Sequence, residues 1–269
     1  MAKTGIHLYC SSSIENWRDK LLRRTGLPLL RWFDFYSPVI FFGMYNLSDY
    51  IRFLIHRGSR RVFWCGSDIQ NLTLFWSRRL KNANHFCENE VEQRALRKMG
   101  LTAEITPMLF DDPADFPISY ESDKNVHVYL TAHLGREREY GIPIVEEIAR
   151  QLPDVIFHIY GIFDYSGAHN VIYHGRVPEE QFNAEIKNYH CALRLNQFDG
   201  ASEIMVKSVL MGQYPISKIE YPYISAYKTQ RRLIHLLRSL KERKEPNYTA
   251  RNWWVEQIRK SLQTILDDE

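Results

Sequence analysis

Short apolar runs alternate with segments of helical spacing along most of the chain. Runs of buried-strand length are followed by stretches in which apolar residues recur every three or four positions. The apolar runs predict strands at residues 5–10, 38–43, 61–65, 126–130, 155–161, 171–175 and 191–195. This alternation is typical of parallel sheets covered by helices on both faces, so the sequence predicts an α/β protein.

The stretch from Cys191 to Ser217 has this pattern most clearly. A buried strand is followed by a polar turn, a helix from about Ser202 to Met211 and a second short strand. Gly212 ends the predicted helix. Together these elements form one βαβ unit.

The turn of this unit predicts an anion site. In open α/β sheets, ligands bind beyond the carboxyl ends of the strands, where a helix begins with unpaired N–H groups and a positive dipole end. Gly200 and Ala201 allow an anion to approach the backbone closely, and Ser202 adds a hydroxyl donor. A phosphate group fits these features.

Length and composition predict two domains. The chain has 269 residues, which exceeds the usual size of one domain. Residues 111–125 contain two prolines and clustered acids without periodicity, as expected of a linker. We therefore expect an N-terminal domain at 1–112, a linker at 113–125, a second domain at 126–230 and helices at 231–269.

Charge limits the partners only loosely. A formal charge of +3 and a pI of about 8.6 are too weakly basic to imply nucleic acid without a clustered patch. Basic and aromatic residues cluster at 17–32 and 231–244, so a nucleic-acid binder stays open as an alternative. Residues 17–32 fit either a helix with a solvated basic face or a segment that lies on an anionic membrane.

No apolar run approaches the roughly 20 residues of a membrane span, and the first residues lack a long apolar signal segment. We therefore expect a cytoplasmic protein, with peripheral membrane contact through residues 17–32 as an open alternative. The four cysteines are far apart and fall in or beside apolar runs, which predicts free, buried thiols and a reducing compartment.

The spacing of cysteines, histidines and acids predicts no metal site. Asp111, Asp112 and Asp115 lie in the predicted linker, where solvated acids are a simpler explanation than a metal-binding pair. No Gly-x-Gly-x-x-Gly motif follows the first strand, so an NAD-dependent dehydrogenase is disfavoured. We expect neither a metal nor a cofactor.

Five residues of the βαβ unit occur in a recognisable order, namely Asp199, Gly200, Gly212, Pro215 and Ile216. Their pattern resembles the donor-site element of GT-B glycosyltransferases, especially the retaining group 1 / family 4 type. The stretches VFWCGSDI and HFCENEVEQRALRKMG are similar to two elements of the N-terminal domain in that family, and they occur in the same order.

The resemblance implies GT-B architecture, with two Rossmann-like domains facing each other across a cleft. It implies a glycosyltransferase of hexosyltransferase type, in which the second domain holds a nucleotide-sugar donor and the first holds an acceptor. It also implies a metal-independent, retaining reaction and a last helix that crosses back to the first domain. The acceptor, whether saccharide, lipid or protein, is left open.

One position departs from the family. Lys207 stands where the family has a second Glu, and an ammonium cannot accept hydrogen bonds from ribose hydroxyls. Either Lys207 turns to a phosphate or the donor site is degenerate. A third interpretation is an ion pair with Glu203 on the helix surface, because the two residues are four apart.

The loop after residue 130 also resembles the family only in part. Its family counterpart has an Arg and a Lys that hold the donor diphosphate, and here Tyr140 takes the place of the Lys. Arg136 and Arg138 are plausible substitutes, because an arginine fork stabilises phosphate charge. The alternative is an exposed ladder of arginines and glutamates over 136–139.

These arguments assign three groups of residues. The catalytic candidates are Arg136, Lys207 and Asp199, and the donor-binding candidates are Gly135, Arg138, Arg194, Gly200, Ala201, Ser202 and Glu203. The acceptor-side candidates are Ser11, Ser12, Gly66 and Asp68, where Ser11 and Ser12 fit a helix cap equally well. Asp68 and His133 remain candidates for a base.

Two further functions remain open on the same fold. A non-catalytic relative would use the fold as a binding module, which the departure at Lys207 favours. A sugar-nucleotide epimerase would convert a nucleotide sugar without any acceptor.

Overall fold

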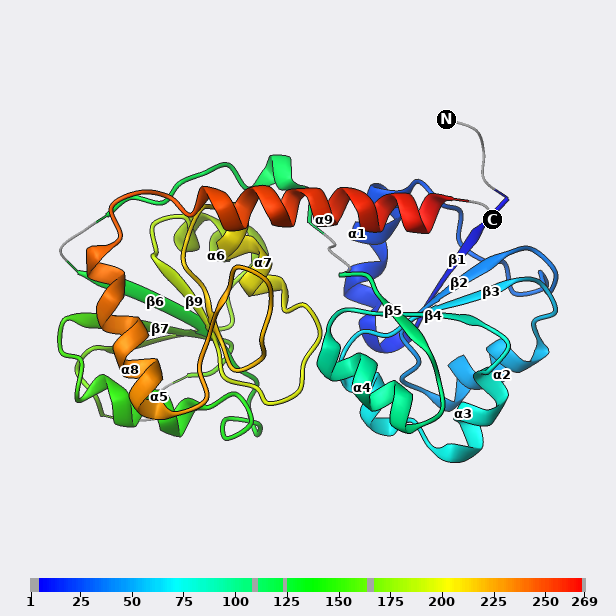
Figure 1. Ribbon diagram of the computed structural model, residues 1–269, viewed down its shortest axis with the longest axis horizontal. Helices are drawn as coiled ribbons and strands as arrows, with labels where there is room; N and C mark the ends of the chain where they lie inside the picture. The colour runs from blue at the N-terminus through cyan, green and yellow to red at the C-terminus, as the bar shows by residue number, and fades with distance from the viewer. Residues whose placement is uncertain (1–4, 108–110, 123–124, 164–166, 268–269) are drawn as a thin grey trace. The chain divides into compact units, whose positions relative to one another are not determined.

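The computed structural model describes residues 5–107, 111–122, 125–163 and 167–267 (Figure 1). The chain divides into two compact units. Unit 1 comprises Met1–Asp112, Phe198–Ala201 and Glu256–Glu269, and unit 2 comprises Pro113–Gln197 and Ser202–Val255.

Unit 1 contains a parallel five-stranded sheet in the order β1-β2-β3-β4-β5. The strands are β1 (His7–Cys10), β2 (Val39–Phe42), β3 (Arg60–Phe63), β4 (Asn84–Cys87) and β5 (Ala103–Ile105). They alternate with the helices α1 (Glu15–Thr25), α2 (Leu47–Ile55), α3 (Leu74–Leu80) and α4 (Glu90–Lys98).

Both faces of this sheet are buried, which explains its continuous apolar runs. Side chains alternate along a strand, so Val39 and Phe41 of β2 enter one core cluster while Ile40 and Phe42 enter the other. Ile265, far along the chain, completes the second cluster.

Unit 2 contains a parallel six-stranded sheet in the order β11-β10-β9-β6-β7-β8. The strands are β6 (Val126–Thr131), β7 (Val155–Tyr160), β8 (Val171–Gly175), β9 (Cys191–Arg194), β10 (Ile216–Ser217) and β11 (Ser225–Ala226). The helices are α5 (Ile142–Ala149), α6 (Glu179–Ile186), α7 (Glu203–Leu210), α8 (Gln230–Ser239) and α9 (Tyr248–Leu266), of which the last continues into unit 1.

A row of histidines runs across three neighbouring strands of the unit 2 sheet, as far as the edge strand β8. His127 of β6, His158 of β7 and His174 of β8 form a chain of ring-to-ring hydrogen bonds, each 2.9 Å long. The row ends at Glu185 of α6, whose carboxylate lies 3.5 Å from the His174 ring and accepts a hydrogen bond from Tyr160. We call these three imidazoles the histidine row.

Three sequence expectations need correction. The helix considered for residues 17–32 extends only as far as Thr25, because Gly26 adopts a left-handed conformation (φ 66°) and Pro28 follows. The strand β11, between 218 and 229, was not predicted, because it is too short to give a periodic signal. Asp111 is buried rather than solvated, because it pairs with Lys20 of α1.

All four cysteines are free, as predicted; Cys65, Cys87 and Cys191 are buried, whereas Cys10 is only partly buried. Within the described ranges, no helix has the length and apolar character needed to cross a membrane.

Candidate functional site

The loop after β6 forms a tight turn at the carboxyl edge of the unit 2 sheet. Backbone bonds from Arg136 N to His133 O and from Tyr140 N to Arg136 O fold it back toward α5. Gly141 precedes α5 with φ 76°, and a Cβ there would lie 2.5 Å from the Leu195 side chain. Only glycine therefore allows this loop to pack directly against the end of β9.

Three arginines from three strand ends surround this loop. Arg136 follows β6, Arg176 follows β8, and Arg194 ends β9. Partial desolvation lowers the pKa of His133, and the charges of all three guanidinium groups lower it further. Because parallel strands end at one edge of a sheet, residues distant in sequence become neighbours here.

Aromatic contacts fix two of these cations. The guanidinium carbons of Arg136 and Arg194 lie 5.5 Å and 5.0 Å from the centre of the Tyr140 ring. His133 meets the same ring edge-on at 5.4 Å. We call Arg136, Arg176, Arg194, His133 and Tyr140 the arginine cluster.

The alternative interpretation of this loop is also present in the structure. Arg136 Nε donates to Glu139 Oε2 at 2.7 Å, and this hydrogen bond lowers the pKa of Glu139. Glu137 accepts from the backbone N–H of Gly135 at 2.8 Å. Arg138 is exposed. Arg136 therefore belongs both to an arginine–glutamate ladder and to the cluster that surrounds His133.

Sequence reasoning missed Arg176. Its signal was available, because it is the first residue after the strand predicted at 171–175. Its charge adds to those of Arg136 and Arg194 at one edge of the sheet.

Lys207 lies on α7 and is only 2% exposed. Its ammonium donates to Glu179 Oε1 at 3.0 Å and Asn183 Oδ1 at 3.0 Å, and it lies 2.7 Å from Glu203 Oε1. The rings of Phe116 and Phe182 cover it, with centres 5.4 Å and 5.8 Å from Nζ. Three acceptors match the three donors of an ammonium group.

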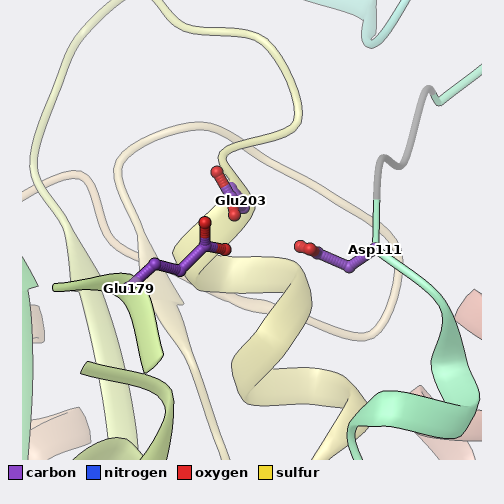
Figure 2. Close-up of side chains that lie close together, drawn as sticks. All are labelled: Asp111, Glu179 and Glu203. Atoms are coloured by element: carbon purple, nitrogen blue, oxygen red, sulfur yellow. The ribbon is translucent and has the colours of Figure 1, made fainter. Parts of the chain in front are cut away.

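The expected ion pair with Glu203 therefore forms, but in a buried environment instead of on the helix surface. A direct contact between Lys207 and a donor phosphate stays a prediction. The Glu179 and Glu203 carboxylates lie close together and remain partly accessible (Figure 2).

The predicted donor turn of residues 198–201 belongs to unit 1. The backbone N–H of Ala201 donates to Glu88 Oε2 at 2.8 Å, and that of Gly200 donates to its neighbour Asp199 Oδ1 at 3.1 Å. Asn89 Nδ2 donates to Asp199 O at 2.8 Å. The backbone donors predicted to hold a phosphate thus face carboxylates in this conformation.

Glu88 and Glu92 form a buried acid pair beneath this turn. Glu92 Oε2 accepts from the backbone N–H of Glu88 at 2.6 Å. Burial raises the pKa of Glu92, and the charge of Glu88 raises it further. Sequence reasoning missed this pair because residues 87–90 suggested only a helix start.

Most of the acceptor-side candidates make contacts within unit 1. Ser11 is buried, caps the following turn and donates to Asp49 Oδ2 at 2.8 Å, so the helix-cap interpretation is confirmed for it. Ser12 is exposed and accepts from Asn46 at 3.1 Å. Asp68 is fully buried and accepts from the backbone N–H groups of Met44 and Cys65, both at 3.1 Å.

Burial raises the pKa of Asp68 to about 7. Gly66 has φ 89°, and a Cβ at this residue would lie 3.0 Å from the backbone N of Gly200. The candidate residues Gly66 and Gly200 are therefore close neighbours in unit 1, although they are far apart in sequence.

No family model matches this sequence, and no curated protein matches it. Solved structures do match most of the chain. The galactosyltransferase WaaB, which acts on the outer core of lipopolysaccharide, is 13% identical with a TM-score of 0.63, over 95% of this chain and 82% of its own. The chain has the GT-B fold.

Two further GT-B structures were determined with UDP. Anabaena HepE, with UDP and glucose, is 11% identical with a TM-score of 0.62, over 84% of this chain and 76% of its own. A TarM variant from S. aureus, with UDP among its ligands, is 12% identical with a TM-score of 0.55 over 85% of this chain. This chain spans about half of TarM, 52% of its length.

Proposed function

We propose that this protein transfers a sugar from a nucleotide-sugar donor to an acceptor. The arginine cluster carries the proposal, because it gathers three guanidinium groups at the edge of the sheet where α/β proteins bind ligands. A diphosphate gains negative charge as the sugar leaves, and preorganised arginines stabilise that charge.

We propose further that Lys207 acts indirectly, as a positioning residue. Its ammonium pairs with the carboxylates of Glu179 and Glu203. The three groups together carry a net charge of −1. Carboxylate oxygens accept hydrogen bonds from hydroxyl groups, whereas the adjacent ammonium repels a second cation. Glu179 and Glu203 would then accept the ribose hydroxyls that the family's Glu accepts at position 207.

Metal independence and retention of configuration belong to the proposal as well. The arginine cluster can neutralise a diphosphate without a metal ion, which supports the first. The second rests on the resemblance of residues 191–217 to retaining enzymes. We propose no cofactor beyond the donor, a saccharide, lipid or protein as acceptor, and a cytoplasmic location.

Isothermal titration with UDP tests the arginine cluster, and UDP is a suitable probe because HepE and TarM were determined with it. Arg136→Ala should weaken UDP binding about tenfold or more, because a charge-assisted hydrogen bond contributes about 1.5–3 kcal/mol. The matched control is Arg231→Ala, which removes an exposed arginine of α8. Equal binding by all three proteins would contradict the proposed site.

A comparison of UDP with 2′-deoxy-UDP tests the assigned carboxylates. Wild type should prefer the ribonucleotide, and Glu179→Gln should reduce that preference. If UDP binds and Glu179→Gln keeps the full preference, the carboxylate assignment fails while the donor site stands.

A non-catalytic binding protein is the second candidate. It is favoured by the bond from Ala201 N–H to Glu88, because this bond engages a donor group that a bound phosphate would use. Incubation with UDP-sugars separates the candidates. A transferase yields UDP and a glycosylated product or slow hydrolysis, an epimerase yields a second nucleotide sugar, and a binding protein yields neither.

A further inference from the structure

Three large aromatic side chains of unit 1 project into solvent from one short loop. The loop connects α1 to β2, and its Trp32, Phe33 and Tyr36 are 79%, 71% and 76% exposed. Exposure of several large apolar side chains together is rare on a soluble surface and marks an interaction site.

A buried arginine holds this loop in place. Arg52 of α2 donates to the backbone carbonyls of Arg31, Trp32 and Asp34 at 2.7–2.8 Å. Its side chain is buried, so these bonds are shielded from water. The backbone of the loop is therefore held by hydrogen bonds, and disorder does not account for the exposure of its aromatic side chains.

The end of the loop is also held by the segment between α2 and β3. The backbone N–H of Arg57 donates to Phe35 O at 2.6 Å, and Asp34 Oδ1 accepts from Ser37 N at 3.0 Å. A Cβ on Gly58 would lie 2.2 Å from the carbonyl oxygen of Tyr36, so this close approach requires glycine.

The helix that carries Arg52 also exposes apolar residues. Leu47, Ile51 and Ile55 of α2 are four residues apart, which places them on one helical face, and all three are exposed. We call these three residues, together with Trp32, Phe33 and Tyr36, the apolar surface.

The stretch of chain that carries the apolar surface is basic. Residues 26–82 contain eight arginines and lysines but three acids, a formal charge of +5, whereas the whole chain carries +3. None of the three acids, Asp34, Asp49 and Asp68, is classed as exposed. Arg31, next to Trp32 in the loop, and Arg57, whose backbone N–H donates to Phe35 O, are both exposed.

We propose that the apolar surface docks on an anionic lipid membrane. Tryptophan and tyrosine suit the boundary between headgroups and acyl chains, and arginines pair with lipid phosphates. Nucleic acid would also attract the aromatic and basic residues, but it offers nothing to the aliphatic side chains of α2. An anionic membrane satisfies all three kinds of residue at once.

The proposed membrane contact differs from that expected at 17–32. Within α1, Lys20 pairs with Asp111 and Arg24 with Asp112, so these two cations are directed to unit 1 itself. Of the expected segment, residues 26–32 belong to the loop between α1 and β2, and Arg31 and Trp32 are the ones used in the proposal.

Co-sedimentation with vesicles tests the proposal. The intact protein should bind vesicles of phosphatidylcholine with 30% phosphatidylglycerol, and binding should fall in high salt or with phosphatidylcholine alone. The double variant Phe33→Ser/Tyr36→Ser should bind roughly tenfold more weakly or worse, because burial of each aromatic side chain contributes on its own. The control Phe163→Ser/Tyr248→Ser removes one exposed Phe and one exposed Tyr of unit 2 and should bind like wild type.

A second readout does not depend on affinity. Brominated lipids should quench the tryptophan fluorescence of bound wild type more strongly than that of Trp32→Phe, because Trp32 would contact the acyl boundary. Equal binding by the Phe33/Tyr36 variant and wild type, or equal quenching with and without Trp32, would overturn the proposal. Binding to single-stranded RNA but not to vesicles would overturn it in favour of nucleic acid.

Discussion

The Nδ1 atom of His158 lies 2.9 Å from the Nε2 atom of His174 on the neighbouring strand, in the middle of the histidine row. Burial, together with the neighbouring imidazoles His127 and His174, lowers the pKa of His158 to about 3. Since an unfolded histidine has a pKa near 6.5, the unfolded chain binds this proton first as the pH falls.

Unit 2 should therefore lose stability on acidification. The contribution of His158 is complete above about pH 6.5 and decreases toward pH 3, by up to about 1.4 kcal/mol per pH unit. Hydrogen exchange resolved by unit is the suitable measurement, because Asp68 of unit 1, whose pKa is raised to about 7, acts in the opposite direction. His158→Gln should flatten the pH dependence, whereas His169→Gln, at an exposed position, should preserve it.

Replacement of Lys207 should destabilise unit 2. Lys207→Met leaves Glu179 and Glu203 without their shared ammonium, and we expect a loss of about 2–3 kcal/mol in urea unfolding, less than for a fully buried pair because both carboxylates are partly exposed. Lys207→Glu, which restores the family residue, should destabilise further through three neighbouring carboxylates. Adding Glu203→Lys to the Lys207→Glu variant should recover part of the lost stability. If it does not, the ion pair between residues 203 and 207 is not the cause of the loss.

Gly200→Ala should disrupt the turn of residues 198–201. The added Cβ would lie 1.7 Å from Glu88 Oε2 and 3.4 Å from Glu92 Oε1, so either the carboxylate or the turn must move. We expect a loss of about 1–3 kcal/mol in thermal or urea unfolding. Gly5→Ala is the matched control, because its Cβ would meet no atom within 4 Å. Equal stability of the two variants would show that the Glu88 contact is dispensable.

Arg52→Lys should loosen the aromatic loop. Lysine keeps the charge but lacks the planar fork that reaches the carbonyls of Arg31, Trp32 and Asp34 together. We expect a loss of about 2 kcal/mol in urea unfolding and faster hydrogen exchange in residues 29–37. The exposed Arg57→Lys should change neither quantity.

Sequence patterns sufficed for most of the fold. The apolar runs around Val39–Phe42 and Val155–Tyr160 are continuous because both sheet faces are covered, and such runs are easily located. The strand Ser225–Ala226 was not predicted, because two residues are too few to show a hydrophobic pattern. The early end of α1 depends on a single glycine. Local signals of one or two residues are thus where prediction failed.

The site was predictable only in part. Arg136 was chosen from the resemblance of its loop to the family, Arg194 was chosen from its place in a predicted strand, and their roles in donor binding stay predictions. The buried state of Lys207 could not be foreseen, because its acceptor Glu179 is 28 residues away in the chain. Likewise, the hydrogen bond from Ala201 to Glu88 could not be predicted, because Glu88 lies 113 residues earlier in the chain.

The long helix α9 has a consequence for the order of synthesis. Its residue Ile265 lies in the same core cluster as Ile6 and Leu8, and Arg61 of β3 donates to the carbonyls of Thr264 and Asp267. A ribosome that has released residues 1–112 has therefore not yet made all of the core of unit 1. This unit must await translation of residues 113–255, so its completion is a late, long-range event that a nascent-chain chaperone would have time to protect.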